Sequence, residues 1–399
     1  MEQVAVTGMG VICPVGSGVE SFWDAIVSGR HGFTTIPQSE ALSGNRLWAA
    51  VPDDLLASLN VPAEFVRNAD RFTQYAVATA AQAFSMAGFD VPPPKTAVVL
   101  GNTMGGLPLL AETQMQLAVN PRHVTPKLMA LVIPNMAAAR ISLNWGLRGR
   151  QLTISTACAS SLDAIGLAAQ LIERGEAVCA VAGGVETLLA PVVYASLERA
   201  GALSHTTDPR KASRPFDVER DGFVMGDGGA MLFLEHVEHA RQRGARILAR
   251  VRGYASMADS HHLTSPEPSG RYEAEVIRAA LDDADAAVEV IYAHATGTVV
   301  GDIAELRAIN ATFPDHRPLV TALRGHLGHA MAAAGATSAI AGILGMERHI
   351  VPHTLGTQNV DPEARFELVL GAPRALRYGA FLVNAFGFGG QNASVVLSR

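Results

Sequence analysis

Three residues of this sequence have side chains and settings suited to acyl transfer, and the first is Cys158. It lies in Thr-Ala-Cys-Ala-Ser-Ser, residues 156–161, where an apolar strand pattern changes into a helical pattern over 160–174. A thiol at a helix N-terminus feels the positive end of the helix dipole, which favours the nucleophilic thiolate. The junction therefore predicts a reactive cysteine. The alternative for a single cysteine is a buried structural residue.

Two histidines each follow an apolar strand pattern. His294 lies in Tyr-Ala-His-Ala-Thr-Gly-Thr, residues 292–298, and His329 follows Gly328 at the start of an Ala-rich helical pattern over 328–347. Either histidine alone could be a core residue bonded to backbone. Together with a cysteine they supply a nucleophile and imidazoles that move protons or stabilise an oxyanion. Nearby, Asp302 and Glu305 have the spacing of a helix-capping pair.

Other classes of site have little support. The histidines stand 329 − 294 = 35 residues apart and neither is in an HExxH or CxxC setting, so we expect no metal site. No GxxxxGK[ST] loop is present, and the glycines at 101–106 lack a GxGxxG pattern. The net charge of 31 − 37 = −6 argues against nucleic acid.

The rest of the chain indicates a reducing, aqueous setting. No apolar run is long enough to cross a bilayer, the start does not read as a signal peptide, and three cysteines are too few for a disulfide framework. We therefore expect a cytoplasmic protein that is not bound to a membrane.

Strand and helix patterns alternate along the 399 residues, of which 49% are hydrophobic, and this predicts an α/β protein with a sheet covered on both faces. Segment 104–135 has weak periodicity and is expected to leave the sheet, and 203–227 is expected to be a long ordered loop. The chain could consist of two related halves, since Cys158 and His329 both stand at strand-to-helix junctions. Strand patterns occur at 4–12, 96–103, 151–158, 177–186, 229–236, 248–256, 289–296, 318–324, 379–386 and 393–398, and helical patterns at 19–29, 74–87, 136–145, 160–174, 191–201, 273–284, 302–312 and 328–347.

Taken together, the motifs resemble the β-ketoacyl-acyl carrier protein synthases of the thiolase superfamily. Their order and separation agree from residue 4 to residue 398, and the elongating enzymes with a Cys-His-His centre fit best. The segments that carry the resemblance are 4–10, 70–75, 133–137, 156–161, 214–217, 220–228, 294–298, 328–329 and 384–392.

The resemblance implies a duplicated thiolase-like fold, layered α-β-α-β-α with two mixed sheets. An N-terminal half, 1–250, would carry the dimerisation and pocket insertions, and 251–399 would form the C-terminal half. The family also implies a homodimer, with a heterodimer containing a related subunit as the alternative.

The implied reaction is a decarboxylative Claisen condensation. Cys158 would take an acyl group from acyl carrier protein, and malonyl carrier protein would then lose carbon dioxide and attack the thioester. His294 and His329 would hold the malonyl thioester carbonyl, and the backbone N–H groups of Cys158 and Phe388 would hold the oxyanion of acyl transfer. Both substrates arrive on phosphopantetheine, and no further cofactor is expected.

The resemblance also implies binding residues. Thr296 and Thr298 would bond the pantetheine arm, Phe386 and the gate residue Phe388 would line the substrate site, and Met104 would line the acyl pocket. The carrier protein is acidic in this family, and its docking surface would include Arg67, Arg71 and Arg122.

One position departs from the family pattern. Arg324 and Gly325 replace the usual Lys-Ser before the second histidine. We expect Arg324 to pair bidentately with Glu305, and its longer side chain to use the space that Gly325 leaves. Arg324→Lys should then be tolerated poorly.

Two other functions stay open. Chain-length-factor subunits shape the pocket of a partner synthase with weak or no condensation, but they usually lack the cysteine. A cysteine hydrolase would need a Cys–His pair and a path for water. The sequence does not separate fatty-acid from polyketide synthesis.

Overall fold

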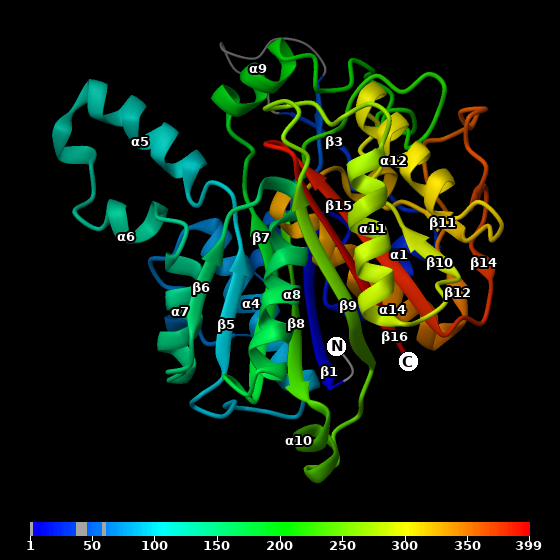
Figure 1. Ribbon diagram of the computed structural model, residues 1–399. Coiled ribbons are helices and arrows are strands. Elements are labelled where there is room, and N and C mark those ends of the chain that lie inside the picture. Colours follow the sequence, from blue (N-terminus) through cyan, green and yellow to red (C-terminus); the bar gives the residue numbers. More distant parts are fainter. Residues whose placement is uncertain (1–2, 37–45, 58–60) are drawn as a thin grey trace.

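A computed structural model describes residues 3–36, 46–57 and 61–399 and shows a mixed α/β fold built on one large sheet (Figure 1). In this sheet β2 (Gly16–Ser17) also pairs with β1 (Val4–Cys13), and two short strand pairs lie outside it: β3 (Thr34–Thr35) with β4 (Leu47–Trp48), and β12 (Ile350–Val351) with β14 (Arg374–Ala375). In spatial order the main strands are β13 (Glu367–Leu368), β11 (Leu319–Thr321), β10 (Val290–Tyr292), β15 (Ala380–Gly387), β16 (Gln391–Ser398), β9 (Ala249–Ala258), β1 (Val4–Cys13), β8 (Gly228–His236), β7 (Cys179–Glu186), β5 (Ala97–Gly101) and β6 (Gln151–Ile154).

The expectation of two separate sheets is wrong, because β1 joins them. Residues 4–6 of β1 pair with residues 234–236 of β8 on one side and with residues 249–251 of β9 on the other. Backbone groups that would otherwise form two open sheet edges are therefore hydrogen-bonded to each other. A register shift between Val6 and Gly8 marks the point beyond which β1 still pairs with β8 but no longer with β9.

The same strand order occurs twice within this sheet. The order β6-β5-β7-β8-β1 matches β11-β10-β15-β16-β9, and the pairs agree in being parallel or antiparallel throughout. Under this correspondence β6, which precedes Cys158, is equivalent to β11, which precedes His329. The repeated order supports the hypothesis of two related halves. A division of the chain at residue 250 remains a prediction.

Helices cover both faces of each half of the sheet. α4 (Arg71–Met86) and α7 (Met136–Trp145) share a core with β5, β7 and β8, and α11 (Arg271–Ala284) and α12 (Val299–Thr312) share another with β10, β11 and β15. Between the two halves lie α8 (Ser160–Glu173) and α14 (Ala334–Arg348), which pack on the opposite face of each. Residues 334–346 of α14 are all buried. Helices therefore lie on both faces of the sheet, and the loops that carry Cys158 and His329 lead into the central helices α8 and α14.

The periodicity of the sequence identified the long elements correctly. Every strand and helix pattern named above overlaps an observed element of the same type. Segment 104–135 does leave the sheet, but it contains α5 (Leu107–Val119) and α6 (Leu128–Val132), which the weak periodicity did not predict. Figure 1 shows this helical arm projecting beside β6. Among the described helices none is long and apolar enough to cross a membrane.

Candidate active site

Cys158 stands at the predicted strand-to-helix junction. After β6 the chain forms a short 3-10 turn, η2 (Ala157–Ala159), that leads into α8. The thiol is buried, and its Sγ atom lies 3.0 Å from Nε2 of His329 and 3.6 Å from Sδ of Met331. A cysteine and a histidine that are distant in sequence are thus in hydrogen-bonding contact.

His329 is held by its backbone against the segment that precedes β8. Its N–H donates to Val224 O at 2.8 Å, and its carbonyl accepts from Gly226 N at 3.0 Å. Gly328, with φ of +67°, turns the chain out of α13 (Arg324–Leu327) into this pairing. The ring of His329 then lies 5.3 Å from that of His294, centroid to centroid, with the planes at 84°.

Glu305 positions the backbone of His294 through hydrogen bonds. One carboxylate oxygen accepts from His294 N at 2.8 Å and the other accepts from Ala295 N at 2.7 Å. The amide of Asn384 on β15 adds a hydrogen bond of 3.1 Å. The expected capping pair at residue 302 is therefore wrong: α12 begins at Val299, and both acids of the pair bind backbone amides outside the helix.

Unusual backbone angles surround all three reactive side chains. Ala157, Ala295 and Met331 have positive φ values of 50°, 30° and 40°, and each lies within two residues of Cys158, His294 or His329. A side chain with a Cβ atom rarely adopts this region, and such strain gathers at functional sites. The strained turns direct the thiol and both imidazoles into one cavity.

Burial decides the protonation of these groups. It raises the pKa of Cys158 to about 12, although Arg324 and the backbone N–H groups of Phe388 and Cys158 act in the opposite direction. Burial thus opposes the thiolate that the helix N-terminus favours, and the uncharged thiol is the resting form. Burial and the charge of Arg324 hold the pKa of His294 and of His329 well below the usual range, so both rings are neutral.

Arg324 does not form the expected ion pair. Its side chain is buried, its Nε and Nη2 atoms have no hydrogen-bond partner, and Glu305 uses its oxygens on backbone amides and Asn384. Burial lowers the pKa of Arg324 to about 10, which leaves the guanidinium charged at neutral pH. Nor does Arg324 use the space at Gly325, where an added Cβ would lie 2.2 Å from Leu355 O. Gly325 is needed for this close backbone approach.

The reactive groups open into a cavity of about 350 Å³. Thr296 and Thr298 line it with their hydroxyl oxygens 3.2 Å apart, and so do Phe386 and Phe388. Phe388 is 40% exposed, as expected for a side chain at an entrance. Met104 is half exposed and does not line this cavity, so its predicted place in an acyl pocket stays a prediction.

The three arginines predicted to meet a carrier protein differ in their surroundings. Arg67 and Arg122 are exposed. Arg71 donates to Asp53 at 2.7 Å and to the Tyr75 hydroxyl at 2.6 Å, and it also bonds Val51 O. Arg71 therefore connects α4 to the segment before it. The side chains of Arg67 and Arg122 are exposed and could meet a partner.

One acid near the thiol was missed by the sequence reasoning. Glu186, at the end of β7, is buried, accepts hydrogen bonds from Thr103 and from Ala332 N at 3.4 Å, and raises the pKa of Cys158. Burial raises its own pKa to about 7. The only sequence signal was a charged residue at the end of an otherwise apolar strand.

The 35-residue separation of His294 and His329 in sequence does not by itself exclude a metal site. The ligand atoms of Cys158, His294 and His329 lie within 4.8 Å of one another, because loops from distant parts of the sequence meet here. The described residues contain a second such group, Cys179, Glu235 and His239. There Arg243 donates to Glu235 at 2.8 Å, and its positive charge opposes a cation.

Comparison with known proteins agrees with this geometry. Residues 1–240 match the family model "Beta-ketoacyl synthase, N-terminal domain" and residues 248–358 match "Beta-ketoacyl synthase, C-terminal domain". The chain is 37% identical over 410 residues to a 3-oxoacyl-[acyl-carrier-protein] synthase 2 of Vibrio cholerae, covering 100% of this chain and 99% of the relative.

Solved structures give the same assignment. A β-ketoacyl synthase from Burkholderia phymatum has a TM-score of 0.92 and 33% identity and is covered completely, as is this chain. The ishigamide ketosynthase/chain length factor also has a TM-score of 0.92, with 31% identity over 100% of this chain and 99% of that one. The thiol–imidazole contact, the second imidazole and full-length similarity lead to one conclusion: the chain belongs to the β-ketoacyl synthase family, a family of acyl-transferring enzymes.

Proposed function

We propose that this protein catalyses the decarboxylative condensation of an acyl group held on Cys158 with malonyl-acyl carrier protein. The observation that carries the proposal is the 3.0 Å contact between Cys158 Sγ and His329 Nε2, with the ring of His294 beside it in one cavity. A nucleophile and two neutral imidazoles aimed at one space can transfer an acyl group and stabilise an enolate.

In the first half-reaction the thiol attacks the thioester of acyl carrier protein. A bond forms between Sγ and the acyl carbon, the bond from that carbon to the pantetheine sulfur breaks, and the thiol proton ends on the departing sulfur. His329 contacts the thiol and is the group placed to carry that proton. The N–H groups of Cys158 and Phe388 already favour negative charge at this point, which supports their role at the oxyanion.

In the second half-reaction the malonyl group loses carbon dioxide. The carbon–carbon bond to its carboxylate breaks, the electron pair forms an enolate, and the enolate carbon attacks the acyl carbon while Cys158 sulfur leaves. Neutral His294 and His329 each carry one N–H that stabilises the enolate oxygen. Nδ1 of each ring has no hydrogen-bond partner, so the fold does not fix either ring in one tautomer.

The rest of the machinery follows the same proposal. The hydroxyls of Thr296 and Thr298 bond the pantetheine arm, and Phe388 acts as the gate at the cavity entrance. Exposed Arg67 and Arg122 attract the acidic carrier protein.

The protein works as a dimer in the cytoplasm. Exposed apolar side chains on the helical arm, among them Met115, Val119 and Met129, support an interface there.

The alternative of a pocket-shaping subunit has one observation in its favour, the likeness to a ketosynthase/chain length factor structure. The complete set of Cys158, His294 and His329 in contact geometry favours the catalytic role.

The test is a reconstitution. The purified protein is incubated with hexanoyl and malonyl carrier proteins, and products are identified by mass spectrometry beside Cys158→Ala and an Arg67→Glu, Arg122→Glu double variant. β-Ketoacyl product with the wild type, none with Cys158→Ala, and a raised KM with the double variant would support the proposal. Acylation of Cys158 followed only by hydrolysis would overturn it in favour of a hydrolase.

A further inference from the structure

The lining of the cavity that holds the reactive groups includes an acidic region, the acidic branch. Besides Cys158 and His294 it is lined by Asp259, Glu273 and Asn392. Asn392 pairs directly with Phe386 across β15 and β16, so their side chains lie on the same face of the sheet. Phe386 in turn lies 5.9 Å from His294, ring centroid to ring centroid. The branch is therefore next to the catalytic histidine.

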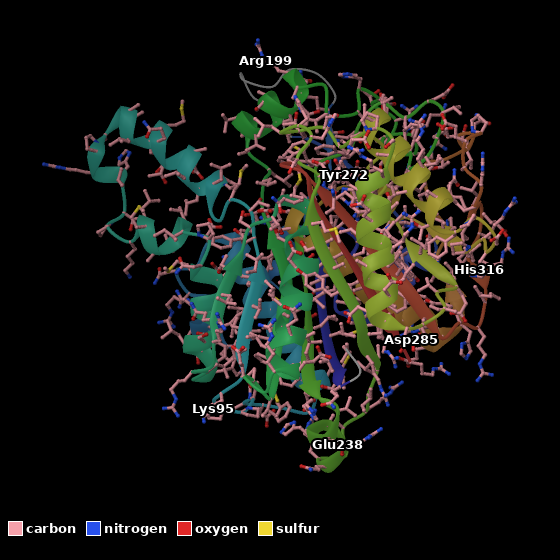
Figure 2. All side chains as sticks on the ribbon, in the orientation of Figure 1. Lys95, Arg199, Glu238, Tyr272, Asp285 and His316 are labelled. Carbon is pink, nitrogen blue, oxygen red and sulfur yellow. The ribbon has the colours of Figure 1, made fainter. Side chains whose placement is uncertain are left out.

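Glu273 is the unusual member of this branch. It lies in the first turn of α11, beside Tyr272, which is labelled in Figure 2. Its side chain is only 2% exposed, yet neither carboxyl oxygen has a hydrogen-bond partner among the residues that the structure describes. The amide nitrogen of Asn392 is also buried without a partner. Buried polar groups in native proteins almost always have partners, and those that lack one are places where a ligand or water fits.

The charged groups that act most strongly on Glu273 are carboxylates. Glu305, Asp259, Asp302 and Glu267 all act on it as negative neighbours, and they raise its pKa further after burial itself. Neither Asp259 nor Glu273 has an ion pair in the described part of the chain. One oxygen of Asp259 accepts from His261 N at 3.0 Å. A positively charged hydrogen-bond donor would satisfy both carboxyls and would relieve the repulsion among them.

We infer that this branch selects substrates that carry a protonated amine, with Glu273 as the residue that recognises it. The inference rests on the proposed function, because the amine would belong to a substrate of the same condensation. The amine-bearing group could be part of the acyl chain on Cys158 or a substituent of the malonyl extender. When the ammonium binds, Glu273 gives up its proton and the two form a charge-assisted hydrogen bond.

The experiment compares substrates matched in size. One arm uses 6-aminohexanoyl against heptanoyl carrier protein with a malonyl extender. The other arm uses aminomalonyl against methylmalonyl carrier protein with a hexanoyl primer. Acylation of Cys158 and condensation are measured separately for the wild type, for Glu273→Gln, and for Glu275→Gln, which removes an exposed carboxylate from the same helix.

We expect the wild type to prefer the amine member of at least one pair by about tenfold in kcat/KM, the equivalent of one charge-assisted contact. Glu273→Gln should lose that preference while its activity with the uncharged members and its melting temperature stay near those of wild type. Glu275→Gln should keep the preference.

Equal rates for both members of both pairs, or an amine preference that survives in Glu273→Gln, would overturn the inference. Condensation of the uncharged members without any amine preference would leave the proposed function standing, so the two failures are distinguishable. If neither pair condensed, the same comparison of amine and uncharged acyl chains in the acylation of Cys158 would decide the inference.

Discussion

The carboxylate of Glu305 holds the backbone of His294 from within the protein, with hydrogen bonds to His294 N and Ala295 N at 2.8 and 2.7 Å. Asn384 contributes a third donor at 3.1 Å. All three groups donate, so they favour an acceptor-only carboxylate over any neutral side chain of the same size. The imidazole of His294 thus owes its position to a residue that does not line the reactive cavity.

Glu305→Gln is expected to damage both stability and catalysis. Gln turns one acceptor into a donor that faces an N–H group, and an unsatisfied buried donor costs about 1–3 kcal/mol. We expect that loss in the free energy of unfolding and a fall in malonyl decarboxylation with less effect on acylation of Cys158. Glu363→Gln, which disrupts an exposed pair with Arg307, is the control and should change stability by less than about 1 kcal/mol. Equal effects of the two substitutions would contradict the positioning role.

Ala295→Gly tests whether the turn beside His294 is strained. Ala295 has φ of +30°, where a Cβ atom costs about 1–2 kcal/mol, and glycine removes that cost while adding about 0.5–1 kcal/mol of unfolded-state entropy. The free energy of unfolding should therefore stay level or rise by up to about 1.5 kcal/mol. Ala293→Gly, outside any positive-φ position, should lose stability instead. Denaturant unfolding of both variants is the measurement, and a loss in Ala295→Gly equal to that in Ala293→Gly would refute the strain.

The features that depend on local sequence pattern were predicted correctly. Strand and helix periodicity located the long elements, and the strand-to-helix junction located Cys158. The number of sheets was mispredicted because it depends on whether residues 4–6 of β1 also pair with β9, which no local pattern reveals. The helical arm was missed because much of its apolar surface faces outward, so it has little periodicity.

Side-chain partnerships were predicted less well than side-chain positions. Glu305 and Arg324 both lie at the site as expected, but the pairing between them fails because backbone amides at the strained turn satisfy Glu305 first. The opposing effect of burial on the Cys158 thiol could not be predicted, because dipole arguments are local, whereas burial is a property of the whole fold. The sequence does not mark Glu273 as a site residue, because an acid in the first turn of a helix is commonplace.

Cys158 is expected to be the only cysteine modified by substrate or by iodoacetamide. Burial raises the pKa of Cys13, Cys158 and Cys179 alike to about 12, so selectivity comes from access: Cys158 alone lines the reactive cavity. Because that pKa lies above the working range, the thiolate fraction rises with pH, and alkylation should accelerate about tenfold per pH unit from pH 6 to 9. Peptide mapping and alkylation rates check both points. A plateau below pH 8 would instead indicate a stable thiolate–imidazolium pair.

The two histidines should separate in their effects. His294→Ala should block malonyl decarboxylation while leaving acyl transfer to Cys158, because of these two histidines it is His329 that contacts the thiol. His329→Ala should impair both steps. Loss of one oxyanion donor costs roughly 10²–10³ in rate. Carbon dioxide release and acylation of Cys158 are measured in parallel, and wild-type decarboxylation in both variants would show that neither imidazole stabilises the enolate.

Arg324 should act through its charge alone, since its Nε and Nη2 atoms hold no partner. Arg324→Lys would leave Glu305 satisfied, because its oxygens bind backbone amides and Asn384, so the expectation that Lys is tolerated poorly is wrong and Lys should keep most of the activity. Arg324→Met keeps the volume and removes the charge. The pKa of Cys158 should then rise further, and alkylation at pH 8 should slow by about tenfold for each unit of that rise. Stability should stay level or increase, because an unpaired buried charge is costly to fold around. Alkylation rates and melting temperatures of both variants are the measurements. If Arg324→Met were destabilised and still alkylated at the wild-type rate, Arg324 would be a packing residue with no electrostatic role at the thiol.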